Sequence, residues 1–413
     1  MDWRSRWHAE TNSQTGESFE RFRAYMEDAQ DGSARIEAFF ETPYGEELTR
    51  RLQARFILEK QPESPEDLAY YHGLGLTKTI RHREDYYGRY TVILPERLSE
   101  ERNKGIRLPL VIACHGYGNS IENEEYMWGF SELAAREGFM LLLPQNTNWD
   151  FVAGMVDEVA EDYPADLSRV YLAGYSQGGN QVISAMYRMP ERLAAAAPSG
   201  CDPDRSQDNF GISYTPEETE RLRAFRVPFL HMAGACERAG FYPMNQWHPL
   251  PPGKIRGQGW NDPRKDNSRD PTILTLNGIP QPSPKDQPPG TGEEADRWKL
   301  EKLNHRLWLQ NCAPLEMTRC LELSKSADPV ERALGICAGE KRVENYLGIR
   351  HFTTTVRDRF GIPSFRLTAM EHGFHAIPVT FGIVCWNWFR LFRRDPDTGE
   401  LKADRYESPW KES

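Results

Sequence analysis

The chain has 413 residues and a formal net charge of −10. Its length allows one elaborated domain or two domains, and its acidic balance argues against a nucleic-acid partner, because binding phosphates requires a basic surface. No apolar run approaches the about 18 residues that cross a bilayer, and the polar start of the chain does not resemble a signal peptide. The seven cysteines are scattered without C-x-x-C pairs, as is typical of reduced thiols. We therefore expect a cytoplasmic protein that binds neither nucleic acid nor membrane; the sequence gives no indication of its oligomeric state.

Residues 1–85 are polar and show little periodicity. Residues 18–29 favour a helix, while 35–40 and 52–58 alternate in the manner of strands. No chemical motif is visible in this region. We interpret it as an N-terminal segment or small lobe of unknown role.

Between residues 86 and 398, apolar strands alternate with helices, which predicts an α/β fold with a doubly wound, mostly parallel sheet. The run 108–113 is apolar throughout, as expected for a strand in the centre of a parallel sheet. Strands are predicted at 90–95, 108–113, 139–143, 169–173, 193–197 and 227–233. A helix after the strand 108–113 is predicted to end near residue 137. Further helices are predicted at 150–163, 180–189 and 215–223.

Two insertions interrupt this alternation. Residues 241–292 are rich in Pro, Gly, Asn and Asp, and we interpret them as an irregular insertion over the carboxyl edge of the sheet and a candidate lid. A helix at 293–312 precedes a second insertion at 313–347, which is predicted to be helical.

The end of the domain is predicted to consist of strands at 351–356 and 365–370 and a helix at 379–394. The basic residues Arg390, Arg393 and Arg394 are expected near the end of that helix, where cations complement the helix dipole. Residues 399–413 are interpreted as a polar tail.

The motif Gly174-Tyr175-Ser176-Gln177-Gly178 stands between an apolar strand and a helix. Gly-x-Ser-x-Gly in this setting is the nucleophile elbow of the α/β-hydrolases. Because the turn is strained, we expect both glycines where a Cβ would collide with the neighbouring strand and helix. Ser176 is therefore predicted to be a nucleophile, with the amide groups of the following helix directed at a developing oxyanion.

Acyl transfer by a serine also needs a base, an orienting acid and two oxyanion donors. The backbone amides of Gln177 and Tyr117 are the expected donors, one after the nucleophile and one in the loop after the strand 108–113. Glu237 follows a strand beyond the elbow and is the predicted acid. Asp202, one strand earlier, is the alternative, and Asp358 in a turn near residue 360 is a weaker one.

Two histidines compete for the role of base. His375 is favoured over His372, because the residues after the last strand let the chain turn back towards Ser176, with backbone freedom at Gly373. His115, in the loop after the strand 108–113, is interpreted as structural. The histidines lack H-E-x-x-H spacing and no phosphate loop is present, so the sequence predicts no metal and no cofactor.

From Tyr90 to Arg394, apart from the insertions, the chain resembles the poly(3-hydroxybutyrate) depolymerase and feruloyl esterase group of α/β-hydrolases, which is carbohydrate esterase family 1-like. The stretches that carry the resemblance are 108–120, 166–179, 194–200, 308–312, 353–355 and the His-x-x-Pro at 375–378. The chain departs from that group at Glu237, where an Asp is usual, and at Phe374, where a Gly precedes the histidine. Unlike this chain, members are commonly secreted and often disulfide-bonded.

The resemblance implies an α/β-hydrolase fold and a serine esterase that acts on small or oligomeric esters. Feruloyl, acetyl and hydroxybutyryl groups all remain open as the acyl group. The aromatic side chains of the first insertion either contact an aromatic acyl group or pack the lid: Phe241, Tyr242, Trp247 and Trp260. The alternatives are a prolyl-oligopeptidase-like peptidase, although no propeller repeats precede the domain, and a non-catalytic binding protein on a hydrolase scaffold.

Overall fold

The computed structural model describes residues 42–58, 64–82, 88–100, 103–116, 120–208, 211–234, 275–276, 279–280, 293–371 and 379–410. The chain divides into two compact units. The elbow unit, which contains the Gly-x-Ser-x-Gly motif, comprises residues 54–199, 216–230 and 377–413. The hairpin unit comprises residues 1–53, 200–215 and 231–376.

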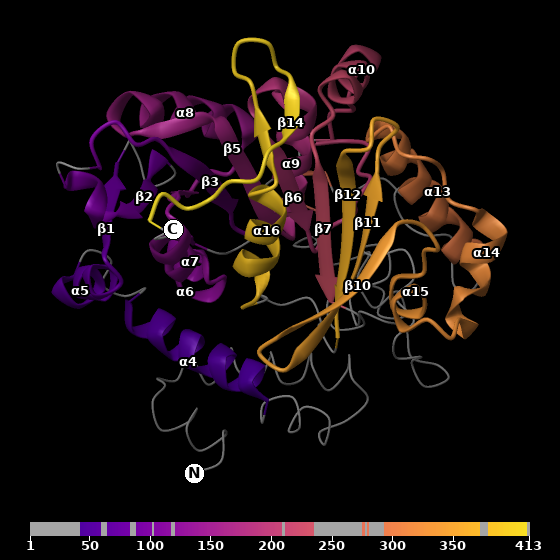
Figure 1. Ribbon diagram of the computed structural model, residues 1–413, viewed down its shortest axis with the longest axis horizontal. Coiled ribbons are helices and arrows are strands. Elements are labelled where there is room, and N and C mark those ends of the chain that lie inside the picture. The colour runs from indigo at the N-terminus through magenta and orange to yellow at the C-terminus, as the bar shows by residue number, and fades with distance from the viewer. Residues whose placement is uncertain are drawn as a thin grey trace. The chain divides into compact units, whose positions relative to one another are not determined.

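The elbow unit is built on a sheet in which the strands follow the order β1-β2-β4-β3-β5-β6-β7 (Figure 1). Pairing is parallel from β4 to β7 and antiparallel where β1 and β2 join the edge. The strands are β1 (Leu76–Arg81), β2 (Tyr90–Pro95), β3 (Leu108–Cys114), β4 (Met140–Pro144), β5 (Ala165–Tyr175), β6 (Ala195–Ser199) and β7 (Phe229–Gly234), of which the first two residues belong to this unit. This order confirms the predicted mostly parallel sheet.

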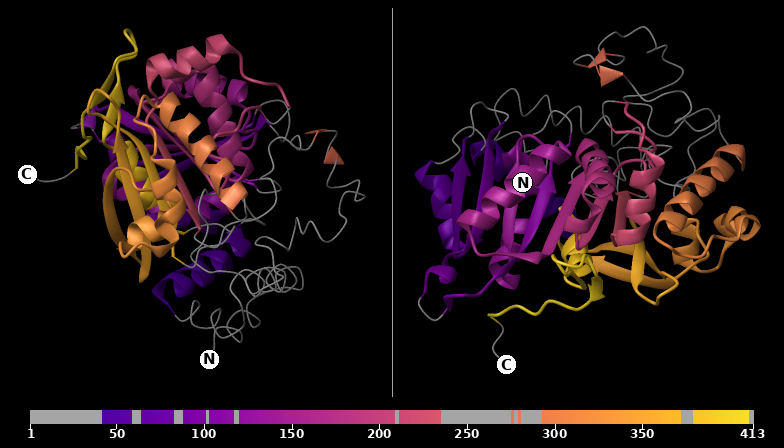
Figure 2. Two further views of the ribbon diagram at one scale, coloured as in Figure 1. Left: turned by 90° about the vertical axis from the view of Figure 1, so that its right-hand side faces the viewer. Right: turned by 90° about the horizontal axis from the view of Figure 1, so that it is seen from above.

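Helices cover both faces of this sheet, so it is doubly wound as predicted (Figure 2). On one face α8 (Trp149–Asp162) and α9 (Gln177–Arg188) contact each other and β5. On the other face α7 (Phe130–Glu137) contacts α16 (Phe381–Phe389) and also β2 and β4. The remaining helical elements are α5 (Pro65–Gly73), η2 (Glu96–Ser99), α6 (Ile121–Met127), η4 (Pro190–Arg192) and α10 (Pro216–Phe225).

The second half of β5, from Val170 onwards, is an apolar run because both of its faces are covered. Tyr171 stacks on Phe389 of α16, with ring centroids 5.1 Å apart, so odd-numbered positions point to that helix. An added Cβ at Gly174 would point to α9, where it would lie 2.9 Å from a Val182 methyl group. Alternate residues of a strand face opposite sides of the sheet. Both sides are buried here, so both sets of positions are apolar.

The hairpin unit contains an antiparallel set of strands, β12 (Pro363–Met370), β11 (Ile349–Arg357) and β10 (Glu340–Tyr346), and the remaining residues of β7. The predicted helix after the first insertion is α13 (Glu293–Leu309), in which Leu300, Leu303 and Leu307 are fully buried. The other elements are α4 (Pro43–Leu58), which continues past the unit boundary, β8 (Thr275–Leu276), β9 (Ile279–Pro280), α14 (Met317–Glu322), η7 (Leu323–Lys325) and α15 (Pro329–Leu334). None of the described helices is long and apolar enough to span a bilayer.

Two predictions of local structure are wrong. Residues 52–58 are the end of α4 and not a strand, because the run contains Leu, Gln, Ala and Arg, which propagate a helix once Pro43 has started it. The insertion 313–347 is helical only in α14, η7 and α15, and it ends in the strand β10. Leu347 and Gly348 both have positive φ and join β10 to β11 as a two-residue hairpin loop.

The C-terminal segment also differs from its prediction. The last helix ends at Phe389, and the chain continues as β13 (Phe392–Arg394), which pairs with β14 (Leu401–Ala403). Within its described residues, 399–410 is therefore not a polar tail: Leu401 is buried and Tyr406 donates a hydrogen bond to the Gly138 carbonyl at 2.7 Å.

Of the three arginines, Arg390 lies at the end of a helix as predicted, whereas Arg393 and Arg394 lie in β13. The guanidinium of Arg394 is buried in β13 and donates to the carbonyl oxygens of Leu193 and Gly399 at 2.6 and 2.7 Å. Arg390 follows α16 directly and pairs with Glu137 of α7 at 3.2 Å. These arginines tie the C-terminal segment to the elbow unit.

Candidate functional site

Ser176 has the backbone of a strained turn between β5 and α9. Its φ is 59° and its ψ is −118°, a conformation that non-glycine residues rarely adopt. The turn is held at both sides, since the Ser176 amide donates to the Ser199 carbonyl at 2.9 Å and the Ser176 carbonyl accepts from Asn180 at 3.1 Å. The serine is half-buried and Gln177 begins α9, so the Gln177 amide lies at the helix N-terminus. The predicted strand–turn–helix setting is confirmed.

Close contacts with neighbouring backbone require a glycine at both glycine positions of the motif. A Cβ on Gly178 would lie 1.9 Å from the Cys114 carbonyl oxygen and 2.6 Å from that of His115. A Cβ on Gly174 would lie 2.5 Å from the backbone of Gly178 and 2.9 Å from a Val182 methyl. Both clashes involve backbone that cannot move without breaking the sheet or α9. The elbow is therefore pressed against the end of β3, where the predicted oxyanion loop begins.

His115 and Gly116 follow β3 directly. The His115 ring lies between two backbone carbonyl oxygens: Nδ1 is 2.9 Å from Gly116 O and Nε2 is 2.8 Å from Gln145 O. The Gln145 side chain also approaches Nε2 at 3.3 Å. A ring engaged at both nitrogens holds the loop, which agrees with the structural role predicted for His115. Tyr117, the second predicted oxyanion donor, lies outside the described residues.

Asp202, the alternative acid, is already engaged by a cation. Its carboxylate forms an ion pair with Lys302 of α13 and accepts the Asp204 amide at 2.9 Å. Burial raises the pKa of Asp202, and the ammonium of Lys302 opposes that shift. Neighbouring Asp204 is paired with His305 at 2.8 Å and lies 3.8 Å from Arg306. The carboxylates after β6 therefore have cationic partners on α13, and no sequence spacing indicated this pairing.

The segment that carries both candidate bases begins at Glu371, immediately after β12. The Glu371 amide donates to the Arg350 carbonyl at 2.9 Å, which extends the β11–β12 ladder by one pair. Its carboxylate is gripped by the Arg350 guanidinium in a forked ion pair, with Nε–Oε2 at 2.9 Å. Hydrogen bonding to Glu371 raises the pKa of Arg350. Sequence reasoning missed this anchor, although Glu371 directly precedes the first candidate histidine.

Most of the remaining predicted site residues lie outside the described residues, so their placement stays a prediction. They are Glu237, His372, His375, Phe241, Tyr242, Trp247 and Trp260. Asp358, the weakest acid candidate, is in the β11–β12 turn and accepts the amides of Phe360 and Ile362 at 2.8 and 2.9 Å. In the described ranges, no three His, Cys, Asp or Glu side chains are grouped to hold a metal ion.

A hollow of about 330 Å³ lies in the elbow unit away from Ser176. It is lined by residues 105–107 and 160–164, which precede β3 and β5. It therefore lies at the amino ends of these strands, whereas ligands of open α/β sheets bind at the carboxyl ends.

Comparison with known proteins gives partial matches. No family model matches the chain. A curated relative, the bifunctional acetylxylan esterase/xylanase XynS20E of Neocallimastix patriciarum, is 29% identical over 102 residues, which are 22% of this chain and 15% of that protein. The chain thus aligns with only a small part of this relative's length. Over those residues the match confirms the predicted resemblance to esterases.

Among solved structures, the chain is similar to the acetyl xylan esterase of Aspergillus awamori, at 13% identity and a TM-score of 0.40, covering 76% of this chain and 98% of that one. A ferulic acid esterase matches at 12% identity and a TM-score of 0.31, covering 39% of this chain and 80% of that one. The strand order, the helices on both faces and the strained Ser176 turn are features of the molecule itself. The chain has an α/β-hydrolase fold, and Ser176 lies in the strained turn between β5 and α9.

Proposed function

We propose that the chain is a serine esterase that hydrolyses carboxylic esters through an acyl-enzyme intermediate. The observation that carries this proposal is the Ser176 backbone, a non-glycine residue at φ 59° between a buried parallel strand and a helix N-terminus. Strained residues of this kind are found at functional sites, where the surrounding structure holds them in place. The partial similarity to an acetylxylan esterase/xylanase supports the same class of reaction.

In the proposed mechanism, a histidine removes the proton of Ser176 as its oxygen attacks the ester carbonyl carbon. His375 is the preferred base and His372 the alternative. The same histidine then protonates the leaving alcohol and later deprotonates the water that hydrolyses the acyl-enzyme. Glu237 orients the imidazole and stabilises its charged form.

The oxyanion of each tetrahedral intermediate is proposed to accept hydrogen bonds from the amides of Gln177 and Tyr117. The Gln177 amide is at the first position of α9, where the helix dipole adds a favourable positive potential. The mechanism uses no metal and no cofactor.

The substrate is proposed to be an acetyl, feruloyl or hydroxyalkanoate ester, either small or oligomeric. The first two acyl groups appear in the names of proteins to which the chain is similar. The aromatic side chains of residues 241–292 are the proposed acyl contacts: Phe241, Tyr242, Trp247 and Trp260.

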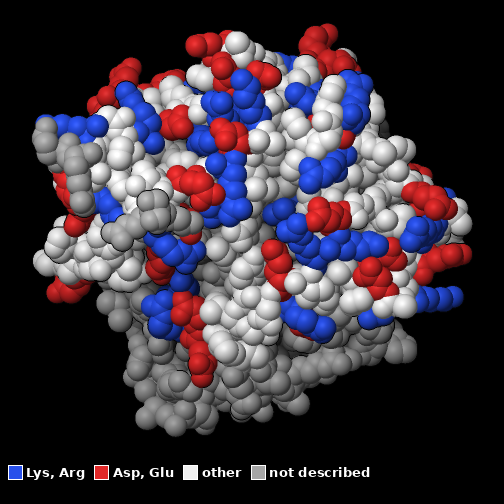
Figure 3. Space-filling model, viewed as in Figure 1, with Lys and Arg blue, Asp and Glu red and all other residues white. Residues whose placement is uncertain are grey.

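We further propose a cytoplasmic location and neither a nucleic-acid nor a membrane partner. The cysteines of the described residues are all free thiols, which supports a reducing compartment. On the face seen in Figure 3, acidic and basic side chains lie beside one another, and the whole chain has a formal net charge of −10.

Ser176→Ala tests the proposal directly. The alanine variant should lose hydrolysis of p-nitrophenyl acetate and labelling by a fluorophosphonate, because both need the serine oxygen. Unchanged circular dichroism would show that the fold survives. Turnover of esters near the wild-type rate in this variant would refute the central claim.

A panel of substrates separates the rival functions. An esterase should cleave p-nitrophenyl esters and leave peptide anilides intact, whereas a prolyl-oligopeptidase-like peptidase should cleave the anilides. A binding protein on a hydrolase scaffold should cleave neither and should not react with the fluorophosphonate.

A further inference from the structure

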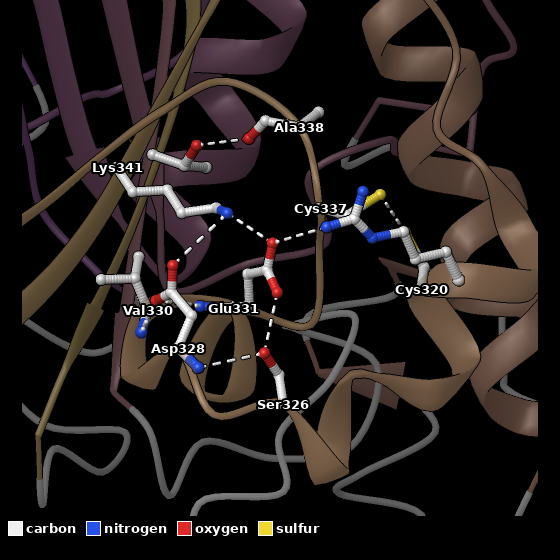
Figure 4. Close-up of polar contacts among 10 residues, drawn as sticks. Cys320, Ser326, Asp328, Val330, Glu331, Cys337, Ala338 and Lys341 are labelled. Atoms are coloured by element: carbon white, nitrogen blue, oxygen red, sulfur yellow. Dashed lines mark hydrogen bonds and ion pairs between the residues drawn. The ribbon is translucent and has the colours of Figure 1, made fainter.

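Two cysteines of the hairpin unit face each other at a short distance. The Sγ atoms of Cys320 and Cys337 are 3.5 Å apart (Figure 4). Cys320 is buried on α14, whereas Cys337 is partly exposed in the segment between α15 and β10. A third cysteine of this unit, Cys312, directs its thiol to the Gln310 carbonyl at 3.7 Å instead.

A network of polar contacts centred on Glu331 holds the elements that carry the pair. Glu331 lies on α15, and its carboxylate binds Lys341 of β10, Ser326 at 2.8 Å and Arg319 of α14 at 3.3 Å (Figure 4). The Lys341 hydrogen bond lowers the pKa of Glu331, so the carboxylate is charged at neutral pH. One carboxylate thus joins the residue before Cys320 to the strand that follows Cys337.

The second cysteine is fixed from the sheet side as well. Thr354 of β11 donates to the carbonyl of Ala338, the residue after Cys337, at 2.6 Å. Asp328 caps α15 by accepting the Val330 amide at 2.8 Å and lies 3.4 Å from the Lys341 ammonium. Both thiols are therefore presented to each other by backbone that is already held in the reduced protein.

We propose that Cys320 and Cys337 form a redox site that closes to an intrachain disulfide when a low-molecular-weight disulfide, such as glutathione disulfide, is present. The proposal is independent of the esterase function. Cys337 is the thiol that reacts first with this oxidant, because it is the partly exposed member of the pair.

The reaction proceeds by two thiol–disulfide exchanges. The Cys337 thiolate attacks one sulfur of glutathione disulfide, and a mixed disulfide forms as one glutathione leaves. The Cys320 thiolate then attacks the Cys337 sulfur, and the second glutathione leaves. Two thiols of the chain lose two protons and two electrons, and one glutathione disulfide is reduced to two glutathione molecules.

The second exchange should be the slow one at neutral pH. Burial raises the pKa of the Cys320 thiol to about 12, so little thiolate is present there. Below that value, the rate constant of the second exchange should rise about tenfold for each pH unit.

The crosslink would join α14 to the segment that leads into β10 and would enclose α15. Closing a loop of this length restricts the unfolded chain and so favours the folded state. Oxidation should therefore raise the midpoint of thermal unfolding by a few degrees.

The test incubates the full chain with glutathione disulfide at about pH 8.5 and maps its peptides without reduction. Wild type and the control Cys312→Ser should both yield a crosslinked Cys320–Cys337 peptide and a raised unfolding midpoint. Cys320→Ser should stop at the mixed disulfide on Cys337, and Cys337→Ser should leave Cys320 unmodified. Cys320→Ala replaces the serine variant if that variant does not fold.

A second variant probes the network. Glu331→Gln keeps the shape of the side chain but loses the charge that binds Lys341 and Arg319, so closure should slow at least severalfold. The proposal is overturned if wild type retains both thiols or only the mixed disulfide at equilibrium. A crosslink that runs through Cys312, or an unchanged unfolding midpoint after crosslinking, would also overturn it.

Discussion

The Ser176 backbone owes its conformation to two neighbours without side chains. A Cβ at Gly178 would clash with the carbonyl oxygen of Cys114, and a Cβ at Gly174 would clash with the backbone of Gly178. The serine supplies only its hydroxyl; the left-handed φ is imposed by the junction of β5, β3 and α9. The proposed nucleophile is therefore held by backbone contacts that do not depend on the substrate.

Of the two main candidates for the orienting acid, the structure describes Asp202, whose carboxylate already has a cationic partner. Asp202 is bound by Lys302, so it has a partner other than an imidazole. We expect Glu237→Gln to lower kcat about 10⁴-fold, because the amide cannot stabilise an imidazolium. Asp202→Asn should break the ion pair with Lys302 and lower stability, with kcat within a few-fold of wild type. Steady-state kinetics with p-nitrophenyl acetate measure both, and the reverse pattern would assign the acid to Asp202.

At the scale of elements, the hairpin β11–β12 delivers the chain to the segment 372–378. Arg350 secures the last residue before that segment through a backbone hydrogen bond and a forked ion pair with Glu371. Misplacing a catalytic group by about 1 Å costs up to about 100-fold in rate. If a histidine of this segment is the base, we expect the anchor to affect the rate by positioning that histidine.

Arg350→Met should lower kcat roughly tenfold to a hundredfold while KM changes little, because the variant loosens the base and not the binding site. Arg350→Lys should recover part of the rate through a single hydrogen bond. Arg342→Met on the exposed edge strand β10 is the matched control, since the ion pair of Arg342 is with Glu340, two positions away on the same strand. An unchanged kcat in Arg350→Met would remove the positioning role.

Two alanine substitutions distinguish the two candidates for the catalytic base. His375→Ala should be as inactive as Ser176→Ala, while His372→Ala should retain measurable hydrolysis. The expectation rests on the sequence, which predicts a turn over residues 371 to 374 with backbone freedom at Gly373. Inactivity of His372→Ala with an active His375→Ala would exchange the two assignments and leave the esterase proposal intact.

The sequence predicted elements where one local rule dominates. The run before Ser176 is apolar on both faces and is followed by Gly-x-Ser-x-Gly, so strand, turn and helix were all predictable. The charged strand β10 was not, because Glu340 to Tyr346 has no apolar alternation and is a strand only through pairing with β11. Pairings such as Lys302 with Asp202 join distant residues and leave no periodic signal.

The insertion 241–292 is the proposed determinant of substrate choice. It follows the predicted acid, and we expect it to govern which acyl group is accepted and not the chemistry. Replacing it by a short Gly-Ser linker should change KM and the preference between acetyl and feruloyl esters, while small acetyl esters are still cleaved. An unchanged preference across a panel of acyl lengths would contradict a lid role.

For the whole molecule, two buried groups should shape how stability depends on pH. His351 on β11 is completely buried, and burial lowers its pKa to about 4, against an ordinary value of 6.5. Glu124 on α6 is buried with no hydrogen-bond partner among the described residues, and burial raises its pKa well above the ordinary 4.5. The two groups therefore make the stability depend on pH in opposite directions.

Between pH 4 and 6.5, the unfolded chain binds a proton at His351 that the folded chain does not, so stability falls as the pH is lowered through this window. Above pH 4.5, the folded chain retains a proton at Glu124 that the unfolded chain releases, so stability falls as the pH rises. Each proton changes the slope of the free energy of unfolding by about 1.4 kcal/mol per pH unit.

His351→Asn should therefore remove the loss of stability between pH 6.5 and 4, which is of the order of 3 kcal/mol in the free energy of unfolding. Glu124→Gln should remove the loss of stability above pH 4.5. The readout is the slope of unfolding free energy against pH from urea titrations, because the cavity left by Asn shifts absolute stability at every pH. Glu66→Gln, at an exposed position of α5, is the control. Slopes identical to wild type in His351→Asn would mean that this imidazole is protonated alike in the folded and unfolded chain, and the same result in Glu124→Gln would mean that its carboxyl group is ionised in the fold.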